Sequence, residues 1–111
     1  MIKVLIADDQ ELIRQSLSII LGLKEEISVV GGVGDGTEVL EFIAKEKPDI
    51  ILMDIRMPIM DGIQATEKIR TISLTVPIIA VTAYAFYTEQ QQAIQAGCNA
   101  VISKPYSLER L

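Results

Sequence analysis

An apolar run that stops at a single carboxylate constrains the fold of this chain more than any other feature. Residues 50–53 are Ile-Ile-Leu-Met, and Asp54 follows them directly. A short apolar run bounded by turn signals is typical of a strand that is buried on both faces. Pro58 and Asp61-Gly62 then mark a loop. We therefore expect Asp54 at the carboxyl end of a central strand, which is the edge where open α/β sheets bind ligands.

Strand and helix patterns alternate along the rest of the chain. The sequence predicts strands over residues 3–7, 28–30, 50–53, 78–81 and 100–102. It predicts helices over residues 11–23, after a cap at Thr37, over about 62–70, from the capping-box pattern Thr88–Gln91 to Gly97, and from Ser107 onward. The glycines at 31, 32, 34 and 36 predict a loop. This alternation indicates one α/β domain over residues 1–111, with a parallel sheet covered by helices on both faces.

Composition excludes several classes of function. The 111 residues carry 15 acidic and 10 basic side chains and no histidine. A net charge of −5 argues against binding to nucleic acid or to an anionic membrane, because phosphate contacts need a basic patch. The single Cys98 excludes an internal disulfide and fits a reducing compartment. No apolar run approaches the length of a membrane span, so we expect a cytoplasmic domain.

Acidic side chains follow two of the predicted strands and indicate a magnesium site. Asp8 and Asp9 follow the first strand, and Asp54 follows the third. Neighbouring carboxylates repel one another, and Mg²⁺ prefers oxygen ligands while keeping several waters. We expect Asp9, Asp54 and the backbone carbonyl of Arg56 to hold the ion, with Asp8 on a metal-bound water. The alternative is that Asp8 and Asp9 only favour the start of the first helix by their charge.

Asp54 in this setting is a candidate phosphoacceptor. A carboxylate can attack a phosphoryl group and form an aspartyl-phosphate. The Lys104 ammonium at the end of the fifth strand would neutralise charge on the phosphoryl oxygens, and the Thr82 hydroxyl at the end of the fourth would donate to one of them. Each has a plainer alternative: Asp54 as a ligand or loop residue, Thr82 as a turn residue, and Lys104 as a solvated surface lysine.

Six motifs in this order resemble the receiver domain of two-component response regulators. They are Val4–Asp9, Asp49–Pro58, Met60–Gly62, Pro77–Ala83, Ala96–Cys98 and Lys104-Pro105. The resemblance implies a flavodoxin-like sheet with strand order 2-1-3-4-5. It also implies that a sensor histidine kinase or phosphotransfer domain phosphorylates Asp54, that Asp8, Asp9 and Asp54 bind Mg²⁺, and that Thr82 and Lys104 sense the phosphoryl group. Phosphorylation would then switch the face built from the fourth helix, the fifth strand and the fifth helix.

The resemblance assigns three tuning positions and carries two departures. Arg56 and Tyr84 lie two residues beyond Asp54 and Thr82, where the family tunes phosphate lifetime. Val101 stands where the family usually has an aromatic switch residue. The chain stops at Leu111, so we expect a truncated fifth helix and an uncovered apolar patch that favours association, such as a homodimer. An output domain would lie beyond Leu111.

The first half of the chain, through Arg70, resembles receivers of LuxR-type regulators. The second half, from Pro77, resembles receivers of hybrid sensor kinases. This difference is compatible with ordinary variation or with a recombined chain.

Three other functions stay open from the sequence. One is a phosphate-independent interaction domain, for which Val101 and the short end argue. Another is a small aspartyl phosphatase, although such enzymes resembling the haloacid dehalogenase group need an acid where this chain has Arg56. A flavin carrier is the most remote, because the acidic edge would repel a flavin phosphate. A phosphoacceptor is not expected to be a turnover enzyme.

Overall fold

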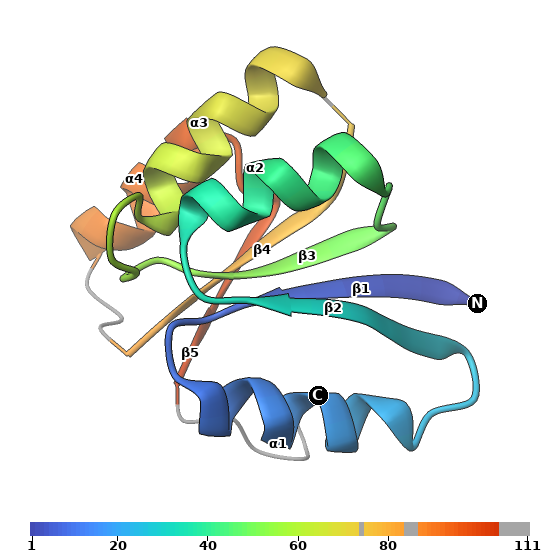
Figure 1. Cartoon of the computed structure of the whole chain (residues 1–111). Helices are drawn as coiled ribbons and strands as arrows, with labels where there is room; N and C mark the ends of the chain where they lie inside the picture. Colours follow the sequence, from blue (N-terminus) through green and yellow to red (C-terminus); the bar gives the residue numbers. More distant parts are fainter. Residues whose placement is uncertain (74, 84–86, 105–111) are drawn as a thin grey trace.

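The computed structural model describes residues 1–73, 75–83 and 87–104, which form a five-stranded parallel sheet (Figure 1). The strands are β1 (Ile2–Ala7), β2 (Ile27–Val33), β3 (Ile50–Asp54), β4 (Ile78–Thr82) and β5 (Ala100–Ser103). Their order is β2-β1-β3-β4-β5, so the predicted flavodoxin-like topology is confirmed. The strand that carries Asp54 lies at the centre of the sheet, and the expected fifth helix falls outside the described residues.

Helices cover both faces of this sheet (Figure 1). They are α1 (Glu11–Gly22), α2 (Gly36–Lys45), α3 (Gly62–Ile72) and α4 (Tyr87–Ala96). One face is covered by α1, and the other by α2, α3 and α4. None of the helices in the described ranges is both long enough and apolar enough to cross a membrane.

Alternation along the strands sorts the apolar side chains into two cores. Leu5, Ile51 and Met53 belong to the core beneath α2, α3 and α4. Val4 and Ile6, which alternate with Leu5, pack in a second core beside α1. Because successive side chains of a strand point to opposite faces, a continuous apolar run can fill both cores at once. That is the physical reason for the apolar run before Asp54.

The prediction of a loop at the glycines was wrong for Gly36, which begins α2, and also for Gly31 and Gly32. Both lie in β2, which pairs with β1 through Leu5↔Gly31 and Ile6↔Gly32. A Cβ at Gly31 would come within 2.6 Å of the Phe42 ring of α2. Glycine therefore lets the ring of Phe42 approach the strand backbone, so the residue marks close packing and not a turn.

Two of the predicted helix caps were also wrong. Asp35 caps α2, and its carboxylate accepts hydrogen bonds from the backbone N–H groups of Thr37 and Glu38. Thr37 lies inside the helix and its hydroxyl also bonds to Asp35. Thr88 likewise lies within α4, after its first residue Tyr87. An Asp side chain accepts from the first turn at least as well as Thr, and Asp35, two residues before Thr37, is the cap of α2.

Gly97, by contrast, follows the last residue of α4 with φ 121°. This backbone conformation favours glycine and is typical of the position just after a helix.

Asp61 and Gln64 form a reciprocal cap at the start of α3, directly after the loop that follows β3. The Asp61 carboxylate accepts from the Gln64 backbone N–H at 2.8 Å, and the Gln64 side chain accepts from the Asp61 N–H at 3.1 Å. We expect Asp61→Ala to lower the free energy of unfolding by about 1 kcal/mol, because the first turn loses an acceptor. Urea denaturation followed by circular dichroism measures the change. Glu67→Ala, on an exposed position of the same helix, is the control and should change it by less than about 0.5 kcal/mol; equal losses in both variants would contradict the role of the cap.

Candidate phosphoacceptor and metal site

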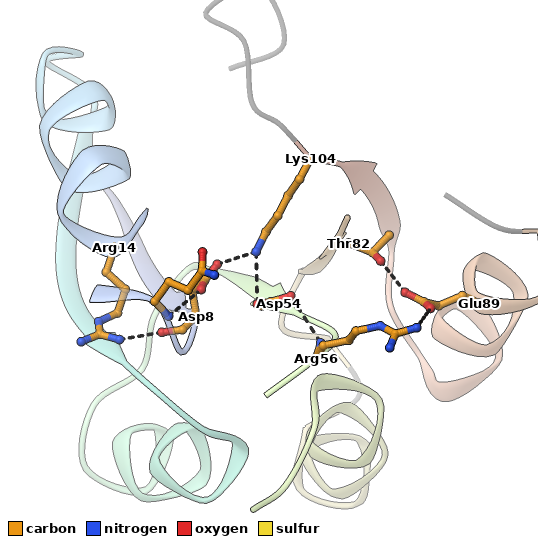
Figure 2. Close-up of polar contacts among 8 residues, drawn as sticks. Asp8, Arg14, Asp54, Arg56, Thr82, Glu89 and Lys104 are labelled. Atoms are coloured by element: carbon orange, nitrogen blue, oxygen red, sulfur yellow. Dashed lines mark hydrogen bonds and ion pairs between the residues drawn. The ribbon is translucent and has the colours of Figure 1, made fainter. Parts of the chain in front are cut away.

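Polar side chains from four strand ends meet at one edge of the sheet (Figure 2). Asp54 ends β3 and Thr82 ends β4. Asp8 follows β1 and Lys104 follows β5. Since all five strands are parallel, their carboxyl ends lie at the same edge. The fold thus brings these residues, which are far apart in the chain, into one site.

Lys104 connects the two buried carboxylates of the site. Its Nζ donates to Asp8 Oδ2 at 2.9 Å and to Asp54 Oδ2 at 3.2 Å. Removal from water lowers the pKa of the Lys104 ammonium, but the hydrogen bond to Asp8 and the charges of Asp54 and Asp8 outweigh this effect and raise it. Lys104 is therefore held as a cation between two anions, with its side chain pointing into the site (Figure 2).

Asp54 is 5% exposed and carries a strongly perturbed carboxyl group. Burial raises its pKa to about 6, and the nearby Asp8 charge adds to the rise. Lys104 and the backbone N–H of Arg56, which donates to Asp54 Oδ1 at 3.3 Å, act in the opposite direction. Asp54 is consequently ionised at neutral pH, but its charge lacks full compensation from the protein alone.

The main chain around Asp8 is fixed by the start of α1. Asp8 Oδ1 accepts from the backbone N–H of Gln10 at 2.9 Å. The Arg14 guanidinium, one turn into α1, donates to the backbone carbonyl of Asp8 at 2.7 Å. These contacts hold the buried Asp8 carboxylate, which is 1% exposed, toward Lys104 and Asp54.

Asp8, Asp9 and Asp54 fit a divalent cation. One carboxylate oxygen from each lies within 4.8 Å of the other two. Asp8 and Asp54 are buried while Asp9 is exposed, so the cluster is open to solvent on the side of Asp9. Clustered carboxylate oxygens with access to water are the donor set that Mg²⁺ uses in proteins. The incompletely balanced charge of Asp54 is a second feature that a cation would correct.

Two of the other predicted site residues contact Glu89 of α4. Thr82 is buried at the edge, but its hydroxyl donates to Glu89 of α4 (Figure 2). The Arg56 side chain points the same way and pairs with Glu89 Oε2 at 3.2 Å. Val101 is half-buried and packs against the core beneath α2, α3 and α4. Tyr84 lies outside the described residues.

Glu89 is the residue of this site that the sequence reasoning missed. It was considered only as part of a capping pattern at the start of α4. One signal was available: an acid in the first turn of the helix that follows β4 lies near the end of that strand. Which side chain it meets there depends on tertiary packing, which periodicity does not predict.

Comparisons with known proteins agree with this geometry. Residues 4–111 match the family model described as the response regulator receiver domain. The response regulator domain of Thermotoga maritima CheB superposes with a TM-score of 0.88 at 33% identity, covering 97% of this chain and 81% of that one. The transcriptional regulatory protein PdtaR of Mycobacterium tuberculosis is 38% identical over 109 residues, 98% of this chain and 52% of that protein.

A sensor histidine kinase, RcsC of Escherichia coli, is 36% identical over 107 residues, which is 96% of this chain and 11% of that protein. Relatives of two kinds, a transcriptional regulator and a kinase, therefore match nearly the whole chain. The chain spans about half the length of the curated transcriptional regulators that it matches.

Proposed function

Because this chain belongs to the response regulator receiver domain family of two-component signalling, we propose that Asp54 accepts a phosphoryl group from a sensor histidine kinase or phosphotransfer domain. The observation that carries the proposal is the contact of Lys104 Nζ with both Asp8 and Asp54 at the carboxyl end of β3. A cation held between two acids, one of them the ionised end of a central strand, suits the transfer of a phosphoryl group.

In the proposed step an ionised Asp54 oxygen attacks phosphorus. A phosphorus–oxygen bond forms, and the phosphorus–nitrogen bond to the donor imidazole breaks with its electron pair remaining on the donor. Lys104 lies beside the attacking carboxylate, where its charge would face a phosphoryl oxygen. The backbone N–H of Arg56 fixes the other Asp54 oxygen. Positioning and charge balance, rather than covalent chemistry by other groups, supply most of what this reaction needs.

Asp8, Asp9, Asp54 and the backbone carbonyl of Arg56 would hold Mg²⁺. When bound, the ion supplies neutralisation of the charge that gathers on the transferring oxygens. The close approach of the three carboxylates supports this assignment. Without a cation, the negative charges of these carboxylates would repel a phosphoryl dianion at the same edge of the sheet.

The modified Asp54 would act on partners through a change at α4 and β5, together with the segment that follows β5. An output domain beyond Leu111 and a homodimer are the forms in which this face would be read. The relatives in which the matching segment is about half of a transcriptional regulator support the first of these.

The test is phosphorylation by a small donor. We expect incubation with acetyl phosphate and Mg²⁺ to add a single phosphate per chain, measured by intact-protein mass spectrometry at pH 7.5. EDTA should remove the labelling, because the three acids then repel the donor. Asp54→Asn should stay unlabelled, while Asp49→Asn, an acid on the opposite edge of the sheet, is the matched control and should label like the original chain.

Two outcomes would overturn the assignment. One is persistent labelling of Asp54→Asn, which would place the acceptor elsewhere. The other is multiple turnover of a phosphate ester, which would favour an aspartyl phosphatase instead. Arg56 argues against the second, because it occupies the position where such an enzyme needs an acid.

A further inference from the structure

Thr82 and Glu89 share a hydrogen bond that the proposed function does not use. Thr82 ends β4 and is buried, and its hydroxyl donates to Glu89 Oε1 in the first turn of α4. The Glu89 side chain is only 12% exposed. A hydroxyl carries one proton, so it cannot donate to Glu89 and to a phosphoryl oxygen at the same time. The two acceptors are therefore mutually exclusive.

The second oxygen of Glu89 faces the loop that follows β3. Glu89 Oε2 pairs with the Arg56 guanidinium at 3.2 Å, and the backbone N–H of Arg56 donates to Asp54 (Figure 2). Glu89 thus connects α4 with two strand ends, that of β4 through Thr82 and that of β3 through Arg56. The Arg56 side chain is 62% exposed, so this pair contributes less than the buried bond to Thr82.

We propose that Glu89 is a positioning residue that holds Thr82 and α4 in the unphosphorylated arrangement, and that a phosphoryl group on Asp54 takes the Thr82 hydroxyl from it. The inference rests on the proposed function and names how that site is regulated. A phosphoryl dianion also repels the Glu89 carboxylate, so both effects favour release of α4. Coupling then passes from Thr82 directly to α4 and needs no aromatic side chain at Val101.

The test uses beryllofluoride with Mg²⁺ as the phosphoryl mimic. Its affinity is measured by two-dimensional NMR on the α4 amides of the full chain. We expect Glu89→Ala to bind the mimic about tenfold more tightly than the original chain, because the competing acceptor is gone. Its free spectrum should also shift at α4 toward that of the bound form. Arg56→Ala should change the affinity less than threefold, since the Arg56 side chain is 62% exposed and solvent weakens its pair with Glu89.

A double-mutant cycle separates this role from a merely structural one. Thr82→Val keeps the shape of the side chain and removes the hydroxyl. If Glu89 acts through that hydroxyl, Glu89→Ala should no longer tighten binding in the Thr82→Val background. Gln95→Ala, an exposed change on the same helix, is the control and should leave the affinity unchanged.

The results distinguish the inference from the proposed function. Equal affinity of Glu89→Ala and the original chain, or the same gain with and without the Thr82 hydroxyl, would overturn the role of Glu89 while Asp54 remained the acceptor. Failure of the original chain to bind the mimic and to take phosphate from acetyl phosphate would instead overturn the proposed function.

Discussion

Asp54→Asn is expected to make the metal-free protein more resistant to denaturation, by about 3 kcal/mol at pH 7.5. The ionised Asp54 is buried beside Asp8, and its pKa rises from 3.8 to about 6 on folding. That rise measures the free energy that the folded state loses by keeping the group ionised. Asn has nearly the same shape but no charge, and Lys104 retains its bond to Asp8. The gain should therefore outweigh the lost contact.

The size of this gain should depend on pH in a defined direction. Below pH 3.8, Asp54 is protonated in both the folded and the unfolded state and does not lower the stability of the protein. Between pH 3.8 and about 6 the folded state holds the proton that the unfolded state has lost, so the stability of the original chain falls as pH rises. Above about pH 6, Asp54 is ionised in both states and the loss of folding stability has reached its full size. Urea denaturation at pH 5 and pH 7.5 should accordingly show a smaller advantage for Asp54→Asn at the lower pH.

Magnesium should reduce the difference in free energy of unfolding between Asp54→Asn and the original chain. A cation that binds only the folded original chain stabilises it by about 2.7 kcal/mol at one hundred times its dissociation constant. The variant lacks one of the three carboxylates and should gain less. Two results would contradict the claim that the buried Asp54 charge is only partly compensated. One is an Asp54→Asn variant less stable than the original chain, and the other is a stability gain that grows as pH falls.

Gly62→Ala is expected to destabilise the protein by about 3 kcal/mol and to reduce phosphorylation of Asp54. Gly62 begins α3, and a Cβ built there would overlap the backbone carbonyl oxygen of Asp54 and lie 2.9 Å from Met53 Cγ. The obstacle is main chain, which cannot rotate away as a side chain would. The start of α3 or the end of β3 must move, and either shift displaces the Asp54 carboxylate, the proposed acceptor.

Gly22→Ala is the matched control for this substitution. Gly22 ends α1, and nothing lies within 4 Å of an added Cβ. Removing the conformational freedom of a glycine in a helix should stabilise the protein by about 0.5 kcal/mol. Thermal or urea unfolding followed by circular dichroism compares the two variants. A Gly62→Ala variant as stable as the original chain would show that the end of β3 tolerates the extra atom.

Sequence reasoning predicted the sheet edge well because strand ends in a parallel sheet are set by topology. A parallel sheet brings the carboxyl ends of all its strands to one edge, and the strand order implied by the family resemblance places the first and fourth strands beside the strand that carries Asp54. Asp8, Lys104 and Thr82 needed no further information to be placed at that edge.

The same reasoning did not predict contacts between side chains of a helix and the strand against which the helix packs. Gly31 was expected in a loop but lies in β2. Glycine occupies this strand position because the Phe42 ring of α2 packs against its backbone. Thr82 lies at the end of the fourth strand as expected, but its hydrogen bond to Glu89 was not predicted. Both outcomes depend on how a helix packs against a strand end, which is decided by tertiary contacts that periodicity does not contain.

Lys104 also fastens the edge of the sheet to its interior. The backbone N–H that follows β5 donates to the Thr82 carbonyl at 2.7 Å, while the side chain passes β4 and reaches acids at the ends of β3 and β1. Edge strands usually fray before central ones because they lose the fewest bonds. Here, local opening of β5 also breaks two ion pairs at the middle of the fold. The mobility of an outer strand is thereby governed by the charge state of residues two and three strands away.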